Sequence, residues 1–500
     1  MEKRKQIKAT GDFLTGKKTY LWVALIAIPL QFVLFRIWYP RPEFMGDSYS
    51  YISAALLHIN IGEWPVGYSK FLGLVHFFTH ADYATVFVQY LLIELSSLYF
   101  LFTLGYFMKP AKWVFNTLFI FLVFNPLYLF MSNYITSDAL FVALSFLWVS
   151  QLIWIVYRPS ITCILLQAIL LLLVFTVRYN AIYYPFIAAL AFLLSSLSWR
   201  RKVMAIGLSF LLIVGFVDYT KTEFEKVTGT SEFSAFSGWQ LANNALYMYK
   251  HVNPTEDPVP ENFTRLDSIT RAFYYSIRAD SDFNESYVGT YYLWAKTSPL
   301  TLYLNDQYPV SLAHQPDFFT KWAAVAPLYS DYASYLIRKY PTAYIQHFVW
   351  PNMFNYVLPP LEVLAVYKED SGPMDARARL WFDYDNRQIA HSPDMLQATI
   401  LSPYPALSGL VNVCFILCIL FFVLFGEYKR VGRVYCGALL LITILWLSNF
   451  AFSVSASPIV LRYQIFPIIL FACFSLLLID VLVRAASEQP VTTKLQPQYS

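Results

Sequence analysis

The sequence predicts an all-α polytopic membrane protein, and three features of its 500 residues support this class. Hydrophobic residues make up 57% of the chain and aromatic residues 19%, whereas charged residues make up only 14%, a composition outside the range of soluble globular proteins. Apolar runs of about 20 residues, long enough to cross about 30 Å of hydrocarbon, recur along the chain. Lys and Arg gather at every second connection between these runs. We therefore expect about ten transmembrane helices.

The predicted spans form a first group of seven and a closing group of three. A long polar region separates the two groups, so the chain is expected to return to the membrane only after a large domain. The spans are predicted near residues 20–38, 83–107, 113–131, 137–157, 160–177, 181–199, 203–219, 406–426, 433–452 and 460–483.

Cationic residues predict which side each connection faces. Basic residues precede the first span and recur after the second, fourth, sixth, eighth and tenth spans, for example at Lys429-Arg430. Cytoplasmic connections carry such an excess of Lys and Arg. Both ends of the chain are therefore expected in the cytoplasm, with the loop 39–82 and the region 220–405 on the outer side.

The outer regions are predicted to be helical. The second half of the 39–82 loop is too short and too polar to span, which favours helices lying in the interface. The long outer region contains amphipathic helical stretches such as 320–340 and no convincing alternating strands, so we expect a mostly helical extracytoplasmic domain. The predicted parts are a seven-span module, this domain, three closing helices and a cytoplasmic tail, at residues 1–219, 220–405, 406–483 and 484–500.

Charge and cysteine content exclude other classes. The net charge of +4 is accounted for by the cations at the cytoplasmic connections. The sequence lacks the basic stripe that nucleic-acid binding needs, so no nucleic-acid partner is expected. All five cysteines fall inside predicted spans, and the outer domain is therefore expected to form no disulfide.

Two acids and two arginines stand at the predicted outer ends of separate spans. Asp47 follows the first span, and Asp138 begins the fourth. Arg178 ends the fifth span, and Arg462 begins the tenth. The planar guanidinium fork of arginine suits phosphate oxygens, and a carboxylate can activate a hydroxyl nucleophile. We expect these four side chains to converge on one cavity at the membrane surface.

Short motifs accompany these charges. Each motif is weak alone, and their order along the chain carries the information. They are Asp47 in the first outer loop, Pro65-x-Gly67-Tyr68 after it, Ser137-Asp138 at the fourth span, Arg178-Tyr179-Asn180 before the sixth, and Arg462-Tyr463 with Pro467 at the last.

In this order and topology, the motifs resemble the GT-C superfamily of membrane glycosyltransferases, in particular the protein O-mannosyltransferase and aminoarabinose-transferase-like group. The resemblance covers residues 20–200 best. It implies transfer of a sugar from a polyprenyl-phosphate donor to an acceptor on the outer side of the membrane, with inversion at the anomeric carbon. The acceptor, a lipid, a glycan or a protein, stays open, because Ser48 follows Asp47 where many protein mannosyltransferases carry an acidic pair.

The resemblance also implies roles for individual residues. Asp47 is expected to act as the general base, and Asp138 to orient the acceptor or to hold a divalent cation. Arg462, with Arg178 as the second candidate, is expected to bind the phosphate of the donor. The other expected contacts are Tyr463 at the phosphate and Tyr68, Tyr179 and Asn180 at the substrate.

The same residues have structural interpretations. Asp47 and Asp138 both precede helical runs, where Asp is favoured as an N-cap. Arg178 and Arg462 can bind lipid headgroups or extend toward water. Structure and catalysis are not exclusive, so both interpretations stay open at this point.

A divalent metal ion is the one cofactor that the sequence leaves open. His76 and His80 are four residues apart and would share one face of a helix, a spacing that can bind a metal. Asp138, or His58 with Glu63, would be further weak candidates. Many histidines in aromatic-rich interfaces bind nothing, so the sequence predicts no definite metal site.

Two other function classes remain. A glycan polymerase or ligase would also handle polyprenyl-linked substrates. A secondary transporter would place polar groups near mid-membrane, and only Glu94 fits this pattern. Following the resemblance, we expect an integral protein of a bacterial inner membrane with its active site facing the periplasm. Its expected partners are membrane lipids, the polyprenyl-phosphate sugar and the acceptor; the sugar itself is not indicated.

Overall fold

The computed structural model describes most of the chain, and this part is helical. One isolated bridge joins Glu43 to Tyr134, and the described residues form no strand. From residue 489 onward, the predicted tail 484–500 lies outside the described residues. The described residues are 13, 16–252, 258–277, 289–309, 316–365, 367, 375–384 and 395–488.

Long apolar helices confirm the polytopic helical class. The described residues contain eight segments that are long and apolar enough to cross a membrane. They are formed by α2 (Lys18–Trp38), α5 (Asp82–Phe107), α6 (Lys112–Val123) with α7 (Pro126–Asn133), α8 (Ser137–Tyr157), α11 (Trp199–Thr228), α20 (Met395–Leu401) with α21 (Tyr404–Leu424), α22 (Arg433–Ala456) and α23 (Leu461–Glu488).

The predicted fifth and sixth spans are shorter than the others. They correspond to apolar helices of 10–17 residues, α9 (Ile161–Val177) and α10 (Tyr184–Leu194), the second preceded by a 3-10 turn over Tyr179–Tyr183. Eight of the ten predicted spans therefore coincide with helices long and apolar enough to cross a membrane, and the other two coincide with shorter apolar helices, so the total of ten spans stays a prediction.

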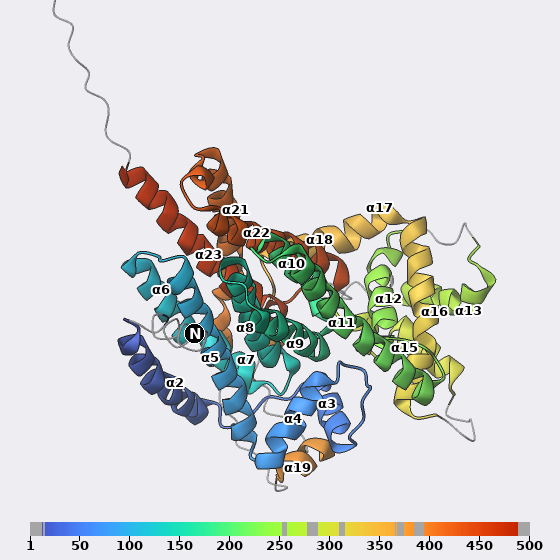
Figure 1. The fold of residues 1–500 in the computed structure, drawn as a ribbon. Coiled ribbons are helices and arrows are strands. Elements are labelled where there is room, and N and C mark those ends of the chain that lie inside the picture. Colours follow the sequence, from blue (N-terminus) through green and yellow to red (C-terminus); the bar gives the residue numbers. More distant parts are fainter. Residues whose placement is uncertain are drawn as a thin grey trace, which may run out of the picture.

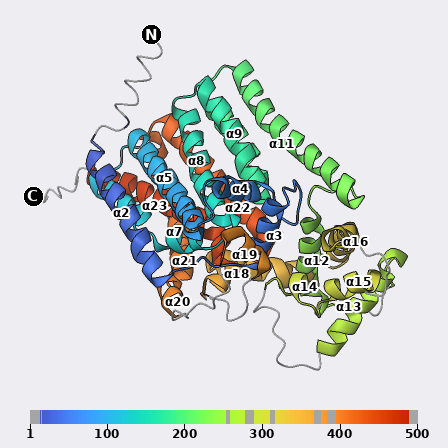
Figure 2. The same cartoon turned by 90° about the horizontal axis from the view of Figure 1, so that it is seen from below.

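The bundle has a buried centre and lipid-facing flanks. In the most apolar stretch of α8 and α23, 72% and 78% of the residues are buried. The corresponding shares in α2 and α11 are only 28% and 22%. Within this stretch, both helices nevertheless expose large apolar side chains, for example Ile26 and Leu211, as expected for helices that face lipid. Figure 2 shows α2 and α11 on opposite flanks of α5, α8 and α9.

Three of the cation-rich segments, before α2, after α5 and at the end of α23, lie together at one end of the bundle. Nζ of Lys17 donates to the carbonyl of Phe102 (3.0 Å). Arg484 pairs with Asp480 (2.6 Å), whose carboxylate also accepts a 2.9 Å bond from the backbone N–H of Ala111. This clustering agrees with the alternation of cations in the sequence, and the side of the membrane that this end faces stays a prediction.

Two short helices occupy the loop after α2, where the sequence predicts interfacial helices. They are α3 (Gly46–Leu56) and α4 (Gly67–Phe78). The loop is tied to the bundle because the backbone of Glu43 bonds to both Asn133 and Ile135. A Cβ added at Gly67 would overlap the carbonyl of Thr176, so glycine allows α4 to approach the end of α9.

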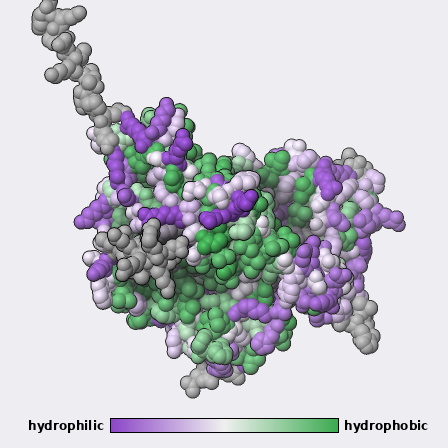
Figure 3. Space-filling view, viewed as in Figure 1, coloured by the Kyte–Doolittle hydropathy of each residue, from purple (hydrophilic) through white to green (hydrophobic). Residues whose placement is uncertain are grey.

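A separate helical unit stands beside the bundle (Figure 1). At its centre, α12 (Ala235–Tyr249) packs against α16 (Phe318–Lys339). The indole N–H of Trp239 donates to the carbonyl of Trp322 (2.9 Å), and the two indole rings stack with centroids 5.5 Å apart. Figure 3 shows hydrophobic side chains gathered over the bundle and more hydrophilic ones over this outer unit. Its main helices are α12 (Ala235–Tyr249), α13 (Thr264–Ile277), α14 (Tyr291–Trp294), α15 (Pro299–Gln307) and α16 (Phe318–Lys339).

The predicted 220–405 domain divides into two parts. From α12 to a π-helical turn at Ile345–Val349, the chain has a hydrophobic core of its own. Beyond α18 (Trp350–Val357), Leu364, Leu401 and α19 (Ala376–Phe382) pack into the core of the bundle instead. The predicted boundary at 219/220 falls inside α11.

Candidate functional site

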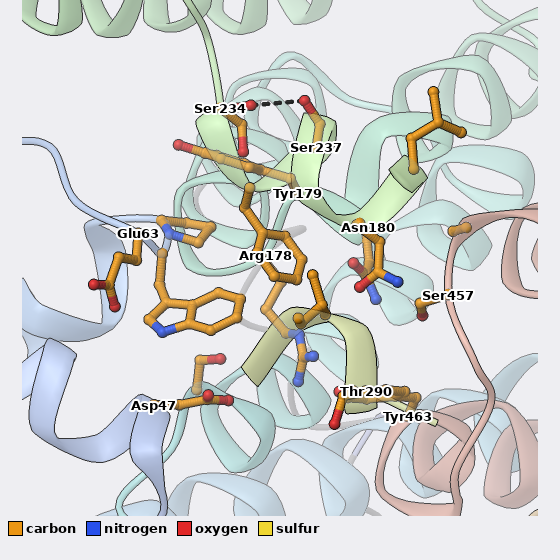
Figure 4. Close-up of a pocket in the computed structure, with 18 of the residues that line it drawn as sticks. Asp47, Glu63, Arg178, Tyr179, Asn180, Ser234, Ser237, Thr290, Ser457 and Tyr463 are labelled. Carbon is orange, nitrogen blue, oxygen red and sulfur yellow. Dashed lines mark hydrogen bonds between the residues drawn. The ribbon is translucent and has the colours of Figure 1, made fainter. Parts of the chain in front are cut away.

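A cavity of about 840 Å³ lies where the outer unit meets the ends of the bundle helices (Figure 4). Its bundle side is formed by α3, the start of α8, the turn after α9 and the start of α23, and its opposite side mainly by α12 and α14. The four charged residues that the sequence predicts to converge all line this cavity. We call this set the charged floor: Asp47, Asp138, Arg178 and Arg462.

The two acids of the charged floor come from the first turns of α3 and α8. The N-caps of these helices are Met45 and Thr136, so Asp47 and Asp138 each lie at the second helical position. The prediction that these two acids are N-caps is therefore wrong. A carboxylate in the first turn still interacts favourably with the helix dipole.

The two arginines differ in their relation to the helix dipole. Arg178 is the C-cap of α9, where a cation complements the dipole. Arg462 lies in the first turn of α23, where the dipole disfavours a cation. Its side chain is only 13% exposed, so extension toward water does not account for it. A guanidinium in this position needs carboxylates beside it, and the charged floor supplies them.

An ion-pair network connects the charged floor. Arg178 pairs with Asp138. Nη1 of Arg462 lies 3.5 Å from Oδ2 of Asp47 and 3.6 Å from Oδ2 of Asp138. The hydroxyl of Tyr463 accepts a 2.7 Å bond from Nη2 of Arg462, and its ring centroid lies 5.0 Å from Cζ of Arg178. The charged side chains are therefore coupled through shared partners.

The two acids differ in exposure. The side chain of Asp138 is 3% exposed, contacts both arginines, and accepts a 3.0 Å bond from the hydroxyl of Thr136. This enclosed position suits a residue that holds the guanidinium groups in place, rather than one that orients an acceptor as the sequence predicts. The side chain of Asp47 is 24% exposed and is the floor carboxylate that a substrate can reach (Figure 4).

Three further acids, Glu63, Glu232 and Glu362, line the cavity and were not among the predicted catalytic residues. Oε2 of Glu63 accepts a 2.5 Å bond from the hydroxyl of Ser50. Glu362 has a left-handed backbone, with φ of +50°. Burial raises the pKa of the Glu63 and Glu362 carboxyl groups above the ordinary value. At Glu362 the positive charge of Arg462 acts in the opposite direction, but burial has the larger effect. Glu63 could have been found from the sequence because it lies in the same outer loop as Asp47. No sequence feature indicates Glu362.

Three of the four other predicted contact residues line the cavity. Tyr68 does not line it, because it is fully buried behind Tyr51, with ring centroids 4.8 Å apart. Its hydroxyl donates a 2.5 Å bond to Oε1 of Gln89, which indicates a structural role. The residues that do line the cavity are Tyr179, Asn180 and Tyr463.

The predicted metal candidates do not converge. The rings of His76 and His80 stack with centroids 4.0 Å apart, and Nδ1 of His80 lies 2.7 Å from Oδ2 of Asp383. Neither histidine lines the cavity, and Asp138 is occupied by the two arginines. Within the described ranges, no three His, Cys, Asp or Glu side chains lie close enough together to hold a metal ion.

The opposite side of the cavity was not indicated by the sequence. Gln240 and Asn244 stand one turn apart on the face of α12 that lines the cavity. Aromatic side chains from the first outer loop, α12 and α14 meet beside them, and in a chain with 19% aromatic residues none of these rings stands out. We call this set the outer wall: Trp64, Phe236, Gln240, Asn244 and Trp294.

No protein-family model, curated protein or solved structure matches the chain. The geometry is therefore the basis for a function. Two guanidinium groups beside an accessible carboxylate suit a reaction in which a hydroxyl loses a proton and an anionic group departs.

Proposed function

We propose that the protein is a membrane glycosyltransferase that moves a sugar from a polyprenyl-phosphate donor to an acceptor on the outer face of the membrane. The observation that carries this proposal is the convergence of Asp47, Asp138, Arg178 and Arg462 in one cavity at the ends of the membrane helices. A lipid-linked phosphate resides at this depth of a bilayer, while its sugar extends toward the outer unit. The resemblance of the motifs to GT-C enzymes supports the same reaction.

In this proposal, the arginines bind the phosphate of the donor. Negative charge develops on the phosphate as the sugar–phosphate bond breaks, and a guanidinium fork in a poorly hydrated site stabilises that charge. Arg462 is the better candidate because its carboxylate contacts are long, 3.5 and 3.6 Å, whereas Arg178 is paired closely with Asp138. An incoming phosphate would compete with Asp47, which lies 3.5 Å from Arg462. Donor binding would thereby release the carboxylate of Asp47 for its own role.

That role is to act as general base. The carboxylate of Asp47 takes the proton of an acceptor hydroxyl while the hydroxyl oxygen forms a bond to the anomeric carbon. The bond between this carbon and the phosphate oxygen breaks, and its electron pair leaves with the polyprenyl phosphate. The attack comes from the face opposite the phosphate, so the configuration at the anomeric carbon inverts.

A glycan polymerase or ligase would use related donor chemistry and differ in what is transferred and accepted. A secondary transporter is less well supported. Its expected polar group, Glu94, is fully buried in α5 and does not line the cavity. The cavity lies at helix ends and not at mid-membrane, where transporter sites are found.

Mass analysis of lipid-linked sugars, glycolipids and glycoproteins tests the proposal in cells. A deletion strain should accumulate a polyprenyl-phosphate sugar and lose one glycosylated product, and the wild-type gene should restore both. Unchanged lipid-linked sugars and an unchanged set of products in the deletion strain would refute a transferase function.

Orientation can be tested separately, because the proposal places the outer unit in the periplasm of a bacterial inner membrane. On a Cys-free background, a cysteine at the exposed position Thr297 should react with a membrane-impermeant reagent in intact cells whose outer membrane is permeable to it. Labelling only after the inner membrane is opened would place the cavity on the wrong side for the proposed reaction.

A further inference from the structure

The cavity offers two unlike surfaces to a substrate. The charged floor suits an anion, whereas the outer wall presents side-chain amides and aromatic rings. The amide groups are already ordered: Nε2 of Gln240 donates to Oδ1 of Asn244 (2.8 Å), and Nδ2 of Asn244 donates to the carbonyl of Ala456 (2.9 Å). The outer wall can therefore form hydrogen bonds with an uncharged ligand without first reorganising.

The aromatic part of the outer wall is a compact cluster. The rings of Trp64 and Phe236 lie 4.6 Å apart, and those of Trp64 and Trp294 lie 6.3 Å apart. In the described part of the chain, the indole N–H of Trp64 is buried and has no hydrogen-bond partner. Because this N–H is buried, the part of Trp64 that a ligand in the cavity can reach is the surface of its ring.

The chemistry of this surface favours a glycan over a lipid or an anionic acceptor, and the experiment below decides between a glycan and a peptide. A pyranose ring has apolar C–H faces, which pack on aromatic rings, and a rim of hydroxyl groups, which bond to amides and carboxylates. A lipid acceptor would need an apolar surface without ordered amides. An anionic acceptor would need cations on this side, where Lys221 is the only one among the described residues lining the cavity outside the charged floor, and Glu63 and Glu232 oppose it.

Resting on the glycosyltransferase function proposed above, we propose that the outer wall is the acceptor subsite and that the acceptor is a glycan whose terminal pyranose ring packs on Trp64. The carboxylate of Glu63, held by Ser50, lies on the same loop as Asp47 and accepts a bond from a second hydroxyl of that ring. This arrangement directs one acceptor hydroxyl to the base at the charged floor, while the remainder of the glycan extends along the outer unit.

Saturation-transfer-difference NMR on the full-length protein in lipid nanodiscs tests this subsite. The probes are methyl glycosides of common hexoses and N-acetylhexosamines, together with a serine- and threonine-containing peptide. We expect transfer to the ring C–H protons of at least one glycoside, reduced at least five-fold by Trp64→Ala. Trp294→Ala, at a 46% exposed position on α14, provides a second variant with little risk to folding. Trp350→Ala, at an exposed position that does not line the cavity, should leave the signal unchanged.

Two competitors separate the acceptor sugar from the donor. Neither geranyl phosphate nor a non-hydrolysable geranyl phosphonate sugar should displace the glycoside, because both occupy the charged floor. Displacement by the phosphonate sugar alone would assign the outer wall to the donor's sugar and overturn the proposal. Absence of glycoside signals, signals unaffected by Trp64→Ala and Trp294→Ala, or peptide signals that depend on Trp64 would also overturn it.

The same samples distinguish failure of the subsite from failure of the enzyme function. Geranyl phosphate should raise the thermal unfolding temperature of the wild-type protein but not of Arg462→Ala. If this protection is found without glycoside binding, the acceptor assignment fails and the proposed function stands. If the protection is absent, the proposed function fails at its donor site.

Discussion

The charged floor and the outer wall face one cavity but are built in opposite ways. The floor consists of four charged side chains, three from the ends of bundle helices and Asp47 from the short helix α3, with exposed fractions between 3% and 24%. The wall consists of uncharged polar and aromatic side chains, supplied largely by the outer unit. Breaking a buried ion pair costs about 3–5 kcal/mol, so each floor residue constrains the others. The wall has no such coupling, and its residues are expected to act more independently.

The largest expected effect is at Asp47. Asp47→Asn keeps the size of the side chain but removes the proton acceptor, so turnover should fall by about 10²–10⁴-fold while donor protection in a thermal-shift assay persists. Asp82→Asn is a matched control, because Asp82 also lies near an arginine, 3.7 Å from Arg36, but does not line the cavity. Near-normal turnover in Asp47→Asn would remove this residue from the mechanism.

The next largest effect is expected at Arg462. Arg462→Ala should lower turnover by about 10²–10³-fold, the usual effect of losing a group that stabilises developing negative charge. Arg462→Lys should be impaired less, because lysine keeps the charge but loses the bidentate geometry. The turnover rate of both Arg462 variants is measured with a polyprenyl-phosphate sugar as donor, and Arg36→Ala serves as the control. If Arg462→Ala turned over normally, the phosphate site would pass to Arg178 or fail altogether.

A smaller and more selective effect is expected on the outer wall. Trp64→Ala should raise KM for the acceptor by about ten-fold, the scale of one lost aromatic contact, with KM for the donor unchanged. Steady-state kinetics with each substrate varied in turn measures the two constants. Equal changes in both constants would mean that the floor and the wall are not separate sites.

The smallest expected effect concerns the pH dependence of stability at Glu63. Burial raises the pKa of this carboxyl in the folded protein, so its contribution to stability is fully present below the unfolded pKa of about 4.3 and is lost as pH rises through the folded pKa. Glu63→Gln should therefore match wild type near pH 4 and unfold about 1–2 °C higher near pH 7.5. Glu261→Gln, at an exposed position, should show no such divergence. A Glu63→Gln protein that is less stable than wild type only at neutral pH would show the opposite linkage.

The charged floor could be predicted because charged residues are rare at membrane depth and usually have a function. The aligned positions of Asp47, Asp138, Arg178 and Arg462 at outer span ends were therefore informative without a structure. Which of these residues pair with each other could not be predicted, because the pairing depends on how α3 and α23 are rotated about their axes. The sequence did not indicate that Asp138 is enclosed and contacts both arginines, which are the observations that favour a holding role.

The outer wall could not be predicted for a physical reason. Trp64 and Phe236 are two among 13 tryptophans and 43 phenylalanines, and their contact arises from packing between distant segments. The fold shows the same limit. Hydropathy predicts the spans, because each spanning segment must be apolar and must make its backbone hydrogen bonds within itself. The division of residues 220–405 between the outer unit and the bundle depends on tertiary contacts such as that of Trp381 with the bundle core, which no local pattern encodes.

The central claim is that the charged floor holds the phosphate of a lipid-linked donor. A cryo-EM structure of the protein in a nanodisc with farnesyl phosphate tests it most directly. The account predicts phosphate density within hydrogen-bond distance of the Arg462 guanidinium, with Asp47 released toward the outer wall. Phosphate bound outside the cavity, with Arg462 still paired to both Asp47 and Asp138, would contradict it.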